Sequence, residues 1–290
     1  MKQPHILDDF QIGPEGAFET TEEPTSMQVS HELPLCLLNK GEQWNDYDFC
    51  LPTYWFKYKA YREYFIKAKQ NKRFIILDNG LFEGDSFTQD ELIKLINELE
   101  PDIFVIPDVW NDAEQSYRNA KYWKNVISHQ LPKNTKLMAV IQCTDFDIGS
   151  KLYLQYIDLG IKHIAFNHSS TAYQDFFPHE NLSISKMMGR IYFINKLKKQ
   201  NIIDEQIYHH LLGCSIPDEL KYYGEGYKFI KSVDSSNPVV WGCKGHSYDE
   251  KITSIEKPKE KIEEFFDKNL GYFQKELILD NIRKFRNYLK

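Results

Sequence analysis

The sequence predicts a single (β/α)8 barrel of the TIM type, and three observations support this prediction. Short apolar runs alternate with helical patterns along most of the 290 residues, an order typical of right-handed βαβ units and a parallel sheet. Roughly six or seven such units fit a barrel, which commonly takes about 250 residues as one domain. The apolar runs also end on polar or turn residues, as strands do at the mouth of a barrel. A doubly wound sheet is the alternative, but neither a Gly-x-Gly-x-x-Gly nor a Walker A pattern occurs in the sequence.

The strands and helices of this repeat follow one another in pairs. The expected strands are residues 33–38, 73–77, 102–106, 136–141, 163–166, 209–212 and 229–233. The expected helices are residues 58–70, 88–99, 112–128, 146–159, 183–199 and 217–224. Thr88 and Glu91 form the pattern of a capping box, and Pro217 lies in the first turn of the last helix. Capping signals therefore support the helices that the apolar period predicts.

The other segments lie around this repeat. Residues 1–30 are polar, contain Gly and Pro, and are expected to form an N-terminal arm. The barrel is expected to span residues 31–257, with a long aromatic loop at 39–57 and a second loop at 244–257. Residues 258–290 are charged with helically spaced apolar positions, so we expect a C-terminal helix that packs on the outside of the barrel.

The composition is that of a globular protein without a broadly basic surface. Hydrophobic residues make up 42% of the chain, charged residues make up 27%, and the formal net charge is −6. A local basic groove is compatible with that charge, because phosphate binding depends on local contacts. No apolar run reaches the ~18 residues that a membrane helix needs, and the N-terminus lacks a signal-peptide pattern. The five cysteines form no Cys-x-x-Cys pair, so we expect a cytoplasmic location without disulfides or a cysteine-rich zinc site.

Polar side chains follow five of the expected strands. They are Asp78, Asp108, Gln142, Asn167 and Asp234. In a barrel all five line the C-terminal face, where active sites lie. Two carboxylates in one cavity suit chemistry at an anomeric carbon, because one forms a covalent glycosyl intermediate and the other handles the proton. The alternative for each residue is a structural role in a turn or loop.

Five segments resemble, in order, motifs of the tRNA-guanine transglycosylase (queuine/archaeosine tRNA-ribosyltransferase) superfamily. Residues 77–83, Leu-Asp-Asn-Gly-Leu-Phe-Glu, resemble its Asp-Ser-Gly-Gly-Phe/Tyr-Gln motif, and residues 102–108 resemble its next strand, which ends in a base-reading Asp. Residues 139–142, Ala-Val-Ile-Gln, are similar to its Val-Gln-Gly-Gly strand end. Residues 210–214, His-Leu-Leu-Gly-Cys, are similar to Tyr-Leu-Met-Gly-Val. Residues 233–238 resemble the Phe-Asp-Cys-Val-x-Pro element that carries the nucleophile.

This resemblance implies a role for each matching residue. Asp234 would be the nucleophile on C1′ of the target guanosine, and Asp78 would be the general base that deprotonates the incoming 7-deazaguanine. Asp108 and Gln142 would bind the edge of the base. The remaining substrate-binding residues would be Phe82 and Leu212 on the faces of the base, Gly213 where the backbone approaches it, and Asn79, Asn167 and His168.

Departures from the family pattern bear on the substrate. The Cys-x-Cys-x2-Cys zinc motif has no counterpart after Cys243, so no cofactor is expected. The family's Gly-Gly is replaced by Asn167-His168, and its Gln by Glu83. These changes are more similar to the DpdA-type DNA-guanine transglycosylases of phages and bacterial islands, which implies DNA and a 7-deazaguanine such as preQ0 as substrates. For a phage-encoded chain the location would be the host cytoplasm.

For duplex DNA, contact with the protein would have to include removal of the target guanine from the stack, because C1′ can be attacked only then. The aromatic residues at 44–56 and the basic residues Lys57, Lys59, Lys231 and Lys244 are the candidates for that contact. The alternatives are the same exchange on tRNA, a metal-dependent barrel hydrolase, and a non-catalytic barrel that binds nucleic acid. The resemblance also allows a homodimer as the oligomeric state, because members of the family often dimerise.

Overall fold

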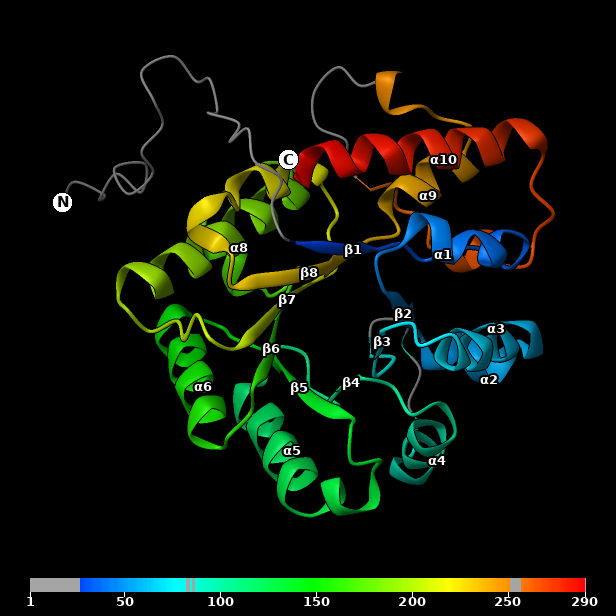
Figure 1. Cartoon of the computed structure of the whole chain (residues 1–290). Coiled ribbons are helices and arrows are strands. Elements are labelled where there is room, and N and C mark those ends of the chain that lie inside the picture. The colour runs from blue at the N-terminus through cyan, green and yellow to red at the C-terminus, as the bar shows by residue number, and fades with distance from the viewer. Residues whose placement is uncertain (1–26, 82–83, 85–86, 251–256, 290) are drawn as a thin grey trace.

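Eight parallel strands form a nearly closed barrel with helices interleaved between them, as the alternating pattern predicts (Figure 1). The computed structural model describes residues 27–81, 84, 87–250 and 257–289. The order of strands in the sheet is β1-β8-β7-β6-β5-β4-β3-β2. The strands are β1 (Gln28–Ser30), β2 (Asp48–Cys50), β3 (Ile75–Leu77), β4 (Ile103–Val105), β5 (Lys136–Ile141), β6 (His163–Asn167), β7 (Tyr208–Leu212) and β8 (Ile230–Asp234).

The first and last strands of that order, β1 and β2, are joined by individual hydrogen bonds. The Phe49 backbone N–H donates to Ser30 Oγ at 3.2 Å. The Asp46 N–H donates to the Val29 carbonyl at 2.9 Å, and the Val29 N–H donates to Asp46 Oδ2 at 2.9 Å. These contacts link the two ends of the sheet, so the barrel is nearly closed.

Most helices lie on the outer surface of the barrel, and several begin with a polar cap. The longer ones are α3 (Lys59–Gln70), α4 (Gln89–Leu99), α5 (Ala113–Asn125), α6 (Phe146–Asp158) and α8 (Leu182–Lys199). The predicted capping box at the start of α4 is present: the Thr88 side chain accepts from the Glu91 N–H, and Glu91 accepts from the Thr88 N–H. Asp112 and Asp145 cap α5 and α6 in the same way, by accepting a backbone N–H from the first turn.

The N-terminal part of the barrel differs from the sequence prediction. Residues 33–38, expected as a strand, overlap the 3-10 helix Leu35–Lys40, and the first strand is instead β1. The segment 39–57, expected as a loop, contains α1 (Gly41–Trp44), β2 and α2 (Pro52–Lys57). β1 comes at the end of a polar segment whose sequence shows no apolar period. In β2, moreover, the polar first residue is buried, which hides the strand from a pattern-based reading.

The buried charge in β2 is Asp48. Arg73 pairs with it through Nε at 2.9 Å, and the Tyr64 hydroxyl donates to it at 3.0 Å. Arg73 comes from the turn before β3, so the carboxylate gains its partners only when the chain is folded. Burial of a carboxylate is tolerated where such partners satisfy it.

The C-terminal helix α10 (Tyr272–Arg286) lies across α9 (Asn237–Cys243), outside the barrel, as predicted (Figure 1). The two helices approach closely at Gly242, where an added Cβ would lie 2.5 Å from a side-chain atom of Ile278. Arg286 pairs with Asp46 at 3.1 Å, which ties the end of α10 to the start of β2. The helix begins later than expected, because residues 262–265 form a separate 3-10 turn. No helix in the described ranges has the length and apolar character to cross a membrane.

Candidate active site

One pocket opens at the C-terminal ends of the strands and holds about 760 Å³ of space, part of it open to solvent. Nine of the ten site residues proposed from the sequence line this pocket: Asp78, Asn79, Asp108, Gln142, Asn167, His168, Leu212, Gly213 and Asp234. The tenth, Phe82, lies outside the described residues. Parallel strands bring residues far apart in sequence to one face, because all their C-terminal ends meet there.

Asp234 is the last residue of β8 and is 5% exposed. Its Oδ1 lies 3.0 Å from His210 Nε2 and accepts the Gly213 backbone N–H at 2.8 Å. Burial acts to raise the pKa of Asp234, but the hydrogen bond and the electrostatic effect of His210, together with the hydrogen bond from the Gly213 N–H, outweigh it and leave this pKa below its usual value. Asp234 is therefore an ionised carboxylate at neutral pH.

Asp78 follows β3 on the other side of the pocket and is 6% exposed. Burial raises its pKa to about 7, against the opposing hydrogen bond from the Gly80 N–H at 3.1 Å. The negative charge of Asp234 raises the pKa further. Asp78 can therefore carry or release a proton near neutral pH, while Asp234 stays ionised.

A third carboxylate, Asp108, is held between two amides. Asn79 Nδ2 donates to its Oδ1 at 2.7 Å, and Gln142 Nε2 donates to its Oδ2 at 2.5 Å. Gln142 Oε1 in turn accepts the Asn111 N–H at 3.1 Å. Burial raises the pKa of Asp108, and the two amide hydrogen bonds lower it again in part. Asn79 Nδ2 also donates to the Ile106 carbonyl at 3.0 Å, so both of its N–H groups are used. The Asp108 carboxylate and the second N–H of Gln142 are therefore the groups of this cluster that can bind the edge of a planar base.

His168 and Gly213 form the wall of the pocket at β6 and β7. Gly213 has a φ of 75°, and a Cβ added there would lie 2.7 Å from His168 Nδ1, so the position requires glycine. Burial lowers the pKa of His168 to about 3, and nearby Arg190 and Lys257 lower it further. His168 is therefore a neutral imidazole. Asn167 accepts the Ser170 N–H at 3.3 Å and so shapes the loop that follows β6.

Arg190 of α8 is fully buried and hydrogen-bonds the backbone of this wall. Its guanidinium donates to the carbonyls of Gly213 at 2.8 Å and Phe166 at 3.1 Å, and it binds both oxygens of Glu219 at 2.7 Å. The bidentate pair satisfies both buried charges and fixes the ends of β6 and β7 relative to each other.

Sequence reasoning missed three functional candidates that line the pocket: Glu32, Trp110 and Lys257. Glu32 follows β1, and burial raises its pKa to about 7 against the effect of Lys257. It is a strand-end carboxylate like Asp78, but it was not identified because β1 was taken for part of an arm. Trp110 lies at the pocket rim and is 42% exposed. Its position two residues after Asp108 is the feature of the sequence that could have identified it as a site residue.

The basic residues expected to contact DNA do not line the pocket. Lys57, Lys59 and Lys244 pair with the acidic residues Glu263, Glu63 and Glu260. Lys231 donates to a backbone carbonyl. Of the expected aromatic segment, Phe49 lines the pocket, whereas Tyr54 and Trp55 are buried in the core.

Within the described ranges, no three His, Cys, Asp or Glu side chains gather as ligands for a metal ion. Comparisons with models of known protein families and with curated protein sequences find no match. The fold and the pocket define a (β/α)8 barrel with a cluster of carboxylates at its C-terminal face.

Proposed function

We propose that this barrel is a base-exchange glycosyltransferase that replaces guanine in DNA with a 7-deazaguanine such as preQ0. The observation that supports this best is a pair of carboxyl groups in one pocket with opposite protonation: Asp234 is ionised, and Asp78 has a pKa of about 7. Retaining glycosyl transfer needs one carboxylate to attack and a second group to give and then take a proton.

The first half-reaction releases guanine. Asp234 attacks C1′ of the deoxyribose and forms a covalent ester, while the C1′–N9 bond breaks and its electron pair goes to the base. Protonated Asp78 supplies the proton that neutralises the departing guanine, and it becomes a carboxylate.

The second half-reaction installs the new base. The Asp78 carboxylate takes the proton from N9 of the incoming 7-deazaguanine, and N9 attacks C1′. The ester bond breaks, Asp234 leaves as a carboxylate, and Asp78 is protonated again. Both carboxyl groups return to their starting states, and neither half-reaction consumes an oxidant or a reductant.

The choice of a guanine-type base is supported by Asp108 and Gln142. Guanine and 7-deazaguanines carry N–H donors at N1 and at the exocyclic amine, which suit the Asp108 carboxylate. Their O6 carbonyl suits an amide donor such as Gln142 Nε2. Leu212 lines the pocket and offers an apolar contact for the flat face of the base.

The choice of DNA over tRNA rests on the departures from the tRNA-guanine transglycosylase pattern, above all the missing zinc motif. The test is to incubate the protein separately with guanine-containing DNA and with tRNA, each with isotope-labelled preQ0 or guanine. The nucleic acid is then digested to nucleosides and analysed by mass spectrometry. Label in DNA alone supports the proposal, label in tRNA alone moves the activity to tRNA, and label in neither refutes base exchange.

Two variants test the assignment of the nucleophile. Asp234→Asn should abolish label transfer and the slow-migrating covalent adduct on a denaturing gel. Asp158→Asn, on the exposed end of α6, is the matched control and should retain both. An adduct that persists in Asp234→Asn would remove Asp234 from the role of nucleophile.

A further inference from the structure

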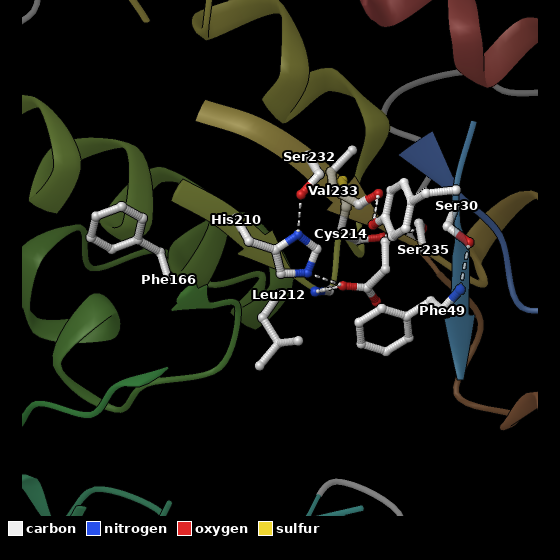
Figure 2. Close-up of polar contacts among 12 residues, drawn as sticks. Ser30, Phe49, Phe166, His210, Leu212, Cys214, Ser232, Val233 and Ser235 are labelled. Atoms are coloured by element: carbon white, nitrogen blue, oxygen red, sulfur yellow. Dashed lines mark hydrogen bonds and ion pairs between the residues drawn. The ribbon is translucent and has the colours of Figure 1, made fainter. Parts of the chain in front are cut away.

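Four side chains in the interior of the barrel form a hydrogen-bonded series that runs from Tyr208 to Asp234. The Tyr208 hydroxyl donates to Ser232 Oγ at 2.7 Å, and Ser232 Oγ lies 2.7 Å from His210 Nδ1. His210 Nε2 lies 3.0 Å from Asp234 Oδ1. Figure 2 shows Ser232 and His210 on the neighbouring strands β8 and β7, with a dashed line between them. Tyr208 and His210 share one face of β7, and Ser232 and Asp234 share one face of β8.

A local irregularity between β7 and β8 creates this alignment. His209 pairs with Ile230, whereas the next residue, His210, pairs with Ser232. The extra residue in β8 shifts the register by one position and brings the Ser232 hydroxyl beside the imidazole. Bulges of this kind re-aim side chains and are common next to active sites.

If His210 is neutral, the chemistry of the groups gives the series one direction. An ionised carboxylate only accepts, so His210 Nε2 must carry a proton to bond Asp234. In neutral His210 the other nitrogen, Nδ1, is then an acceptor, and the Ser232 hydroxyl is placed to donate to it. Ser232 in turn accepts from Tyr208. Each member donates toward Asp234.

Both hydrogen bonds that Asp234 accepts in the described part of the chain end on Oδ1, from His210 and from the Gly213 N–H. We propose that the Tyr208–Ser232–His210 series is a positioning device that fixes His210 as the Nε2–H tautomer and leaves Oδ2 of Asp234 to attack C1′. The catalytic part of this inference rests on the proposed function, whereas the tautomer does not.

The surroundings of His210 make the series necessary. The imidazole is fully buried and stacks on Phe49, with ring centroids 5.9 Å apart and an interplanar angle of 18°. Tyr47 approaches its edge at 6.4 Å. Between these rings an Nδ1 without a donor would be a buried unsatisfied polar atom, which is costly. The other titratable groups that act on Asp234 come from several elements: His31 and Glu32 after β1, Tyr47 before β2, Asp78 after β3, His168 after β6 and Cys214 after β7.

The neighbouring His209 provides a matched control. It is equally buried in β7, but its imidazole bonds the Tyr153 hydroxyl at 3.0 Å and stacks on Phe166, whereas that of His210 bonds Asp234. Substitution of His209 tests the loss of a buried imidazole in the same strand without affecting Asp234.

The tautomer is tested directly by nitrogen NMR on the full chain labelled at histidine. The proposal expects His210 as a neutral Nε2–H imidazole at pH 7, assigned by comparison with His210→Phe. In Ser232→Ala the Nδ1 signal should shift, because its donor is lost. A neutral Nδ1–H form, or an imidazolium at pH 7, would overturn the series as drawn, whether or not the protein exchanges bases.

The positioning role is tested by the kinetics of base exchange in variants that fold, as checked by circular dichroism. His210→Phe keeps a ring against Phe49 but loses the donor, and it should lower kcat about 100-fold with little change in KM. His210→Gln keeps a side-chain N–H donor at this position and should recover most of that loss, and Ser232→Ala should lose about tenfold. His209→Gln should leave kcat unchanged.

Equal losses in His210→Phe and His210→Gln would show that the imidazole only fills space, and wild-type kcat in His210→Phe would also overturn the role. If the wild-type protein exchanges no base at all, the proposed function fails, and the NMR result still decides the hydrogen-bonded series.

Discussion

Asp78 and Asp234 follow strands on different sides of the barrel, line one pocket, and have pKa values that are shifted in opposite directions. The difference arises from their partners. Asp234 accepts hydrogen bonds from an imidazole and a backbone N–H. Asp78 accepts one from the Gly80 N–H, but burial and the charge of Asp234 raise its pKa. The same residue type is thereby suited to two different tasks.

The two half-reactions should respond to pH in opposite ways. Formation of the glycosyl–Asp234 adduct needs protonated Asp78, so its rate should fall as the pH rises through about 7. Transfer of the glycosyl group to the incoming base needs the Asp78 carboxylate, so its rate should fall as the pH drops below about 7. Single-turnover measurements of adduct formation and adduct decay from pH 5 to 9 separate the two rates. Parallel pH profiles would argue against one residue acting as acid and then as base.

Asp78 should also reduce the stability of the protein at high pH. Its pKa is raised from ~4 in an unfolded chain to about 7, so its contribution to folding is complete below pH ~4 and is lost as the pH rises through 7. Asn at position 78 does not ionise, so the Asp78→Asn variant should not lose stability as the pH rises. The free energy of unfolding of this variant should exceed that of the wild type by on the order of 2 kcal/mol at pH 8.

Urea denaturation at pH 5 and pH 8 measures this difference, which should be larger at pH 8. Asp158→Asn serves as the exposed control and should show no such dependence on pH. A variant that is less stable than the wild type at pH 8 would contradict the assigned direction of the pKa shift.

Asp108 should determine affinity for the free base. Replacement of its carboxylate by the amide of Asn removes a charged acceptor and places an N–H donor against the donors of Asn79 and Gln142. We expect Asp108→Asn to weaken binding of preQ0 about 100-fold, as measured by isothermal titration calorimetry. Asp147→Asn, exposed in the first turn of α6, is the control. Unchanged affinity in Asp108→Asn would place the base elsewhere in the pocket.

Loss of one partner of the buried pair Arg190–Glu219 should destabilise the protein far more than replacement of both partners by apolar residues. Arg190→Met leaves Glu219 buried without its cation and should cost about 3–5 kcal/mol of unfolding free energy in urea denaturation. The double variant Arg190→Met with Glu219→Leu removes both charges and should recover most of that loss. A double variant as unstable as the single one would show that the hydrogen bonds of Arg190 to Gly213 and Phe166 matter more than its charge.

Much of the barrel could be predicted from the sequence because its signals are local. The capping box of α4, the length of β5 and the repeated pairing of strand and helix depend on residues close together in the chain. The strand ends carrying Asp78, Asp108 and Asp234 could be recognised for the same reason. The first two strands, β1 and β2, could not be predicted from local sequence in this way. Strand β1 follows a polar segment without an apolar period, and the buried Asp48 in β2 depends on Arg73 from outside its strand.

By itself, then, the sequence determined the barrel class and the five polar residues that follow the strands it predicted, because strand order and turn chemistry depend on residues close together in the chain. Only the tertiary structure decided what those residues can do. Asp234 is ionised because folding brings His210 and Gly213 to its Oδ1, and the pKa of Asp78 is raised to about 7 because folding buries it near that charge. Glu32 lies in the same pocket because β1 pairs with β8, a contact between residues about 200 positions apart that local sequence does not reveal.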